Sequence, residues 1–116
     1  MATILVHIAT GPENPTRAAL GLLIARTASE EEHEVQVFLA GDAVQLVRPE
    51  TADAAQGIGT GSVAEHLEAL RGAGVPIFLS GMSSKARGIE GGEGLELAPP
   101  QKLVELAAWA ETTLTY

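Results

Sequence analysis

Short, almost uninterrupted apolar runs alternate along this chain with longer segments in which apolar residues recur at helical spacing. Such runs are typical of parallel strands that are covered on both faces. Strands that alternate with helices in this way form a parallel sheet between two layers of helices. The pattern therefore predicts a single α/β domain over residues 1–116, a three-layer α/β/α sandwich around a mainly parallel five-stranded sheet.

The predicted strands are residues 4–9, 35–40, 75–79, 95–97 and 112–116. Asn14 is the expected N-cap of the first helix, and Pro15 its first helical residue. Because nearly all sides of this helix are apolar, it is expected to pack on more than one surface. Its predicted buried stripe consists of Leu20, Leu23, Ile24 and Thr27.

Capping and breaking residues delimit the other helices. Ser62 and Glu65 have the spacing of a capping box, which predicts a helix that begins there and ends near residues 72–74. A short helix over residues 43–47 is expected to stop at Pro49, and the glycine-rich residues 49–61 are expected to form the most mobile loop. Pro100 is expected to introduce the last helix, whose predicted apolar face holds Leu103, Leu106, Ala107 and Ala110.

Composition narrows the classes of function. The formal net charge of −8 argues against nucleic acid and against anionic membrane surfaces as partners. The absence of cysteine excludes disulfides, thiolate catalysis and cysteine-ligated zinc, and the three histidines do not have metal-ligand spacing. We therefore expect no metal and no cofactor. No stretch resembles a signal peptide or a membrane span, so a cytoplasmic protein is expected.

Several short motifs follow one another in an order that is typical of one family. They are Gly-x-Glu-Asn-Pro-x-Arg-Ala at residues 11–18, Phe-Leu-Ala-Gly-Asp at 38–42, Leu-x-x-Leu-x-x-x-Gly-Val at 67–75, Ser-Gly at 80–81 and Ala-Arg-Gly at 86–88. Over nearly its whole length the chain resembles the DsrE/DsrF-like sulfur-relay family. The resemblance implies an α/β subunit that self-associates into dimers, trimers or hexamers, and sulfur handling in members that carry a reactive cysteine.

The resemblance places Ser80 and Ser83 where cysteines occur in relatives. A helix N-terminus and the cations Lys85 and Arg87 would lower the pKa of a thiol at this place, but a serine hydroxyl needs a general base and cannot hold a persulfide. The chain is therefore expected to be a cysteine-less family member. Its predicted function is that of a homo-oligomeric protein that is non-catalytic or binds a small anion.

In open parallel sheets, ligands bind at the carboxyl ends of the strands, here residues 10–15, 41–42 and 80–87. For Ser83, a ligand contact and a helix N-cap are both open, as are an anion clamp and surface ion pairs for Lys85 and Arg87. Glu13 is a candidate for an ion pair with Arg87 or Arg17. The predicted ligand-binding residues are Ser80, Ser83, Ser84, Lys85, Arg87, Glu13, Asn14 and Asp42.

Two other functions remain open. The first is a small enzyme that binds an anionic substrate through Arg87 and Lys85, with His7 or Glu13 as acid/base. A Ser83–His7–Asp42 triad would also fit on composition, but the sequence has no nucleophile elbow. The second is a cysteine-less subunit of a hetero-oligomer with a cysteine-containing homologue. Of the other histidines, His33 is expected at the surface and His66 at a subunit contact.

Overall fold

Five parallel strands form the central sheet of the computed structural model, which describes residues 1–116. Their order across the sheet is β6-β5-β2-β1-β7, and every neighbouring pair is parallel. The strands are β1 (Thr3–Ile8), β2 (Glu34–Leu39), β5 (Ile77–Ser80), β6 (Glu96–Ala98) and β7 (Thr112–Thr115). The predicted α/β fold is confirmed.

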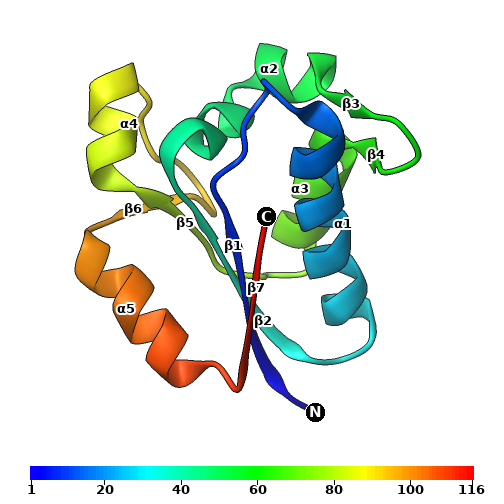
Figure 1. The fold of residues 1–116 in the computed structure, drawn as a ribbon, viewed down its shortest axis with the longest axis vertical. Helices are drawn as coiled ribbons and strands as arrows, with labels where there is room; N and C mark the ends of the chain where they lie inside the picture. The colour runs from blue at the N-terminus through cyan, green and yellow to red at the C-terminus, as the bar shows by residue number, and fades with distance from the viewer.

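Helices cover the two faces of this sheet unequally (Figure 1). Helices α1 (Pro15–Glu30) and α3 (Val63–Gly72) pack over one face, where 21 buried residues form the larger part of the core. Helix α5 (Pro100–Trp109) covers the other face, where the core is a cluster of five buried residues. In α5, Leu106 is buried as predicted, but Ala107 is exposed, since only a narrow side of this helix meets the sheet.

Helix α1 begins as predicted, because the Asn14 side chain accepts a hydrogen bond from the Arg17 N–H at 3.1 Å. The predicted buried stripe, however, is wrong. Leu20, Leu23 and Ile24 are only partly buried, and Thr27 is exposed. The buried residues of this helix are Ala18, Ala19, Gly21, Leu22 and Ala25.

Close packing explains why α1 turns its small residues inward. A Cβ atom on Gly21 would lie 2.8 Å from Cδ1 of Ile8 in β1, which is closer than real Cβ contacts. The helix therefore approaches the sheet through a face on which Leu22 is the one large side chain among alanines and a glycine, and Leu20 and Leu23 are left on the opposite side.

Residues 49–61 are not the predicted loop. Pro49 begins helix α2 (Pro49–Ala54) instead of only ending the preceding 3₁₀ helix η1 (Gly41–Val47), because a proline fits the first turn of a helix, where no N–H is needed. The strands β3 (Gln56–Gly57) and β4 (Gly61–Ser62) then form an antiparallel hairpin.

This hairpin is fastened to both neighbouring helices. Thr16 in α1 accepts a hydrogen bond from the Ile58 N–H, and its carbonyl accepts one from the Thr60 hydroxyl, each at 3.0 Å. His66 in α3 bonds the Thr60 carbonyl at 2.8 Å and is only 5% exposed, so the predicted place of His66 at a subunit contact is wrong. The predicted cap of α3 is confirmed, since the Ser62 hydroxyl accepts from the Glu65 N–H at 3.3 Å. None of the helices is both long enough and apolar enough to cross a membrane.

Candidate functional site

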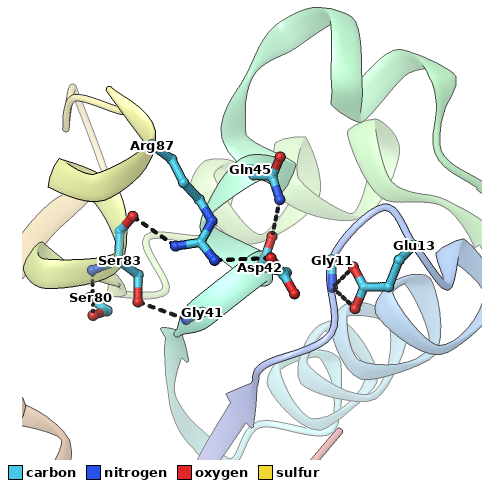
Figure 2. Close-up of polar contacts among 8 residues, drawn as sticks. All are labelled: Gly11, Glu13, Gly41, Asp42, Gln45, Ser80, Ser83 and Arg87. Atoms are coloured by element: carbon cyan, nitrogen blue, oxygen red, sulfur yellow. Dashed lines mark hydrogen bonds and ion pairs between the residues drawn. The ribbon is translucent and has the colours of Figure 1, made fainter.

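The carboxyl ends of β1, β2 and β5 lie at one edge of the sheet, because parallel neighbours end on the same side (Figure 2). Three segments meet there: the loop after β1, the start of η1 after β2, and helix α4 (Gly81–Arg87), which follows β5 directly. These are the three segments in which the sequence predicted a site.

Ser80, and not Ser83, caps helix α4. The Ser80 hydroxyl accepts a hydrogen bond from the Ser83 N–H at 3.2 Å, so the interpretation of Ser83 as the N-cap is wrong. The helix ends at Gly88, whose φ of 66° is left-handed and suits glycine. Ser83 therefore lies in the first turn of α4, with its side chain available for another contact.

That contact is with the backbone of η1. The Ser83 hydroxyl oxygen accepts a hydrogen bond from the Gly41 N–H at 2.9 Å (Figure 2). This bond joins the segment after β5 to the segment after β2, forty-two residues away in the sequence. No side-chain base contacts the Ser83 hydroxyl, although a nucleophilic serine would need one.

Arg87 makes a second link between the same two segments. Its guanidinium donates to the Ser83 carbonyl at 3.1 Å and to the Asp42 carboxylate at 2.9 Å. Both side chains are partly exposed, at 30% for Arg87 and 52% for Asp42, so water weakens this ion pair. The Arg48 guanidinium also donates to the Arg87 carbonyl. Arg87 thus binds the Asp42 carboxylate and the backbone of its own helix, as the ion-pair interpretation of Arg87 predicted.

The loop after β1 is closed on itself. Both carboxylate oxygens of Glu13 accept a hydrogen bond from the Gly11 N–H, at 3.0 and 3.1 Å, and Glu13 pairs with neither Arg17 nor Arg87. In Figure 2 the Glu13 carboxylate faces its own loop. Asn14 serves as the cap of α1. The Glu13 carboxylate and the Asn14 amide thus both accept hydrogen bonds from nearby backbone N–H groups.

The remaining candidates do not form a common site. The Ser84 hydroxyl is fully buried without a hydrogen-bond partner, so a ligand at the surface does not reach it. Lys85 is exposed and has no ion-pair or hydrogen-bond partner. The His7 ring is half-buried, 6.4 Å from the Phe38 ring between centroids. His7 bonds neither Ser83 nor Asp42, so the triad is not assembled.

The hollows of the surface lie elsewhere. The largest, of about 560 Å³, is lined by residues of α2 and α3, and a second of about 340 Å³ lies beside Pro12 and Pro15. A third, shallower hollow lies beside Arg26 and Glu65. None of the three is lined by a predicted site residue, and no group of three His, Asp or Glu side chains gathers.

Three contributions at this edge were missed from the sequence. The Gly41 N–H is a backbone group, which no residue pattern reveals. Gly11 is the second: a Cβ atom there would lie 2.2 Å from the Asp42 carbonyl oxygen, so the first and second segments touch through their backbones. Arg48 carried a weak signal as a cation just before a proline, but its carbonyl partner is 39 residues away.

A comparison with models of known protein families identifies one family. The DsrE/DsrF-like family model matches residues 3–116. The YchN protein from E. coli is 25% identical, with a TM-score of 0.79 over the whole of both chains. The conserved protein of unknown function BT1422 from Bacteroides thetaiotaomicron is 16% identical, with a TM-score of 0.68 over 99% of this chain and 95% of that one, and supports the fold alone. No curated protein matches.

Because the backbones of Gly11 and Asp42 touch, we predict that any side chain at position 11 destabilises the fold. Gly11→Ala should lower the free energy of unfolding by about 1–3 kcal/mol, because the added methyl group meets a backbone oxygen that cannot rotate away. Gly72→Ala is the matched control, since a Cβ at that helix end meets nothing within 4 Å, and it should be neutral or slightly stabilising. Urea unfolding measures both. Equal stabilities for the two variants would contradict the close approach.

The burial of His7 predicts a pH dependence of stability. Burial lowers the pKa of His7 below its ordinary value of 6.5, so the unfolded chain binds this proton more readily than the folded one. The free energy of unfolding should therefore fall as the pH is lowered from 6.5 through the folded-state pKa. His7→Gln should remove this part of the pH dependence. If unfolding at a series of pH values shows the same dependence in both proteins, the prediction is wrong.

Proposed function

Since the chain belongs to the DsrE/DsrF-like family, we propose that it is a cysteine-free, non-catalytic member that works as a homo-oligomer. One observation carries the proposal. The serine at the place where relatives hold a cysteine uses its hydroxyl to bind the Gly41 N–H and so to join two strand-end segments. In this proposal, the segment after β5 has a structural role, which is to hold the segment after β2 in place.

The chemistry of the site residues supports this role. A thiolate reacts because nearby positive charge lowers its pKa, whereas a serine hydroxyl in the same surroundings stays protonated and cannot carry sulfane sulfur. Asp42, the carboxylate nearest to this segment in the hydrogen-bond network, is paired with Arg87. His7 lies beside Phe38 with no link to the network. No acid or base is held against the Ser83 hydroxyl.

Anion binding, the other part of the sequence-based prediction, has less support. A built anion site needs several donors that converge on one point. Here the donors of Arg87 already serve the Ser83 carbonyl and Asp42, which leaves Lys85 as the free cation of α4. An isolated exposed lysine on a flexible stem is a weak site. We therefore place assembly, and not ligand capture, at the centre of the proposed function.

Self-association has independent support in α1. This helix buries small residues against the sheet, while Leu20, Leu23 and Ile24 on its other side stay partly exposed. A surface helix that needed only one covered face would carry polar residues there. The apolar residues on both sides are those expected of a helix that is covered in an assembly.

Native mass spectrometry of the protein, purified gently from its own cells, tests the proposal. We expect whole multiples of the 12.0 kDa subunit with no added mass. A retained small molecule that is lost from the Arg87→Ala variant, while assembly is kept, would establish the anion-binding or enzymatic alternative. A second, cysteine-containing type of subunit would establish the hetero-oligomeric sulfur-relay alternative, and a bare monomer would contradict all assembly-based functions.

A further inference from the structure

Helix α1 presents an apolar stripe that the fold of one subunit covers only in part. At 3.6 residues per turn, Leu20, Leu23, Ile24 and Thr27 lie at i, i+3, i+4 and i+7 on one side of the helix. The buried residues, among them Ala18 and Leu22, lie on the opposite side. A helix that is apolar on both sides is typical of a helix covered on both sides. The sheet and α3 cover the opposite side, so the stripe stays partly exposed.

The hairpin beside α1 extends this apolar surface. Its tip residue, Ile58, is 87% exposed, yet the hairpin is fixed to Thr16 by two hydrogen bonds. A large apolar side chain on a firmly held tip costs less to order on binding than one on a loose loop. We call Leu20, Leu23, Ile24, Thr27 and Ile58 together the α1 surface.

The charges around the α1 surface favour a second copy of the same chain. The subunit has a formal net charge of −8, so two copies repel each other wherever both are acidic. Helix α1 is not acidic, since it carries Arg17 and Arg26 against a single Glu30. The acidic turn follows only at its C-terminal end, with Glu31 and Glu32. Two antiparallel copies of α1 would bring Arg17 of each helix to the acidic end of the other.

We propose that a second copy of this chain packs on the α1 surface, with the two α1 helices antiparallel about a two-fold axis near Leu23 and Ile24. In this arrangement Leu20 lies opposite Thr27 of the partner helix, and Leu23 opposite Ile24. The contact is self-complementary, as a two-fold interface requires. The outer side of α1 and the hairpin over residues 56–62 would together supply the contact on each subunit. The inference rests on the proposed homo-oligomeric function and adds where the subunits meet.

The first test places charges in the stripe. In Leu20→Lys/Ile24→Lys, the ammonium group at position 24 lies near its own copy beside the axis, and the one at position 20 is set against Thr27 of the partner helix. Because both charges lose water in the interface, the dissociation constant of the oligomer should rise at least about 30-fold. The control is Met82→Lys/Val104→Lys, which adds the same charges at two side chains that are each 70% exposed. They belong to α4 and α5, on the other side of the molecule from α1 (Figure 1). The control should leave the subunit number unchanged.

A charge exchange tests the orientation without touching the half-buried stripe, so it remains decisive if the lysine variant fails to fold. Arg17 and Glu31 are exposed, and neither side chain has an ion-pair partner within the subunit. Arg17→Glu should raise the dissociation constant about tenfold, because it sets like charges against each other. Arg17→Glu/Glu31→Arg should restore it. Light scattering with size-exclusion chromatography over a range of concentrations measures all five proteins, and circular dichroism checks their folding.

Each outcome decides between the inference and the function on which it rests. Dissociation of the stripe variant and of Arg17→Glu, with rescue by the charge exchange, supports the inference. An oligomeric wild type whose assembly is insensitive to both sets of changes overturns the inference and leaves homo-oligomerisation standing. A wild type that is monomeric at every concentration overturns both. Dissociation of the Met82→Lys/Val104→Lys control instead, or a second type of subunit on the α1 surface, also overturns the inference.

Discussion

Parallel pairing of β1, β2 and β5 is the constraint on which the rest of the structure depends. Strands with apolar residues on both faces are stable only between two layers, and parallel strands bring their carboxyl ends to one edge. Three segments that are distant in the sequence are thereby forced together. Their backbones contain N–H groups that need partners, and the Ser83 hydroxyl supplies one for Gly41.

The contacts at this edge of the sheet show how the fold can be stable without a reactive cysteine. In relatives, the resemblance places a cysteine where this chain has Ser83. A hydroxyl is a better hydrogen-bond acceptor than a thiol, so the serine strengthens a structural link at the place where it removes a nucleophile. Arg87 has a similar structural role, because it binds both the Asp42 carboxylate and the Ser83 carbonyl. In the function that we propose, the subunit offers its surroundings a surface for assembly.

The elements that the sequence predicted well are those determined by interactions between residues close together in the chain. The apolar runs predicted the strands, because a strand that is buried on both faces needs apolar residues along its length. Asn14 and Ser62 predicted the helix starts, because their side chains accept hydrogen bonds from N–H groups of their own helices. The face of α1 was mispredicted because a stripe of large apolar residues does not show which surface covers it, and here the small residues face the sheet. The candidate site was located at the correct edge, but its contacts involve the Gly41 and Asp42 backbone, which residue types do not encode.

Amide hydrogen exchange at Gly41, followed by NMR in the wild type and in Ser83→Ala, tests the central claim most directly. If the Ser83 hydroxyl is a structural acceptor, the Gly41 N–H is protected in the wild type and exchanges much faster in the variant, while the amides of β1 and β2 keep their protection. A Gly41 N–H that exchanges freely in the wild type, or at the same rate in both proteins, would show that this serine does not hold the two segments together.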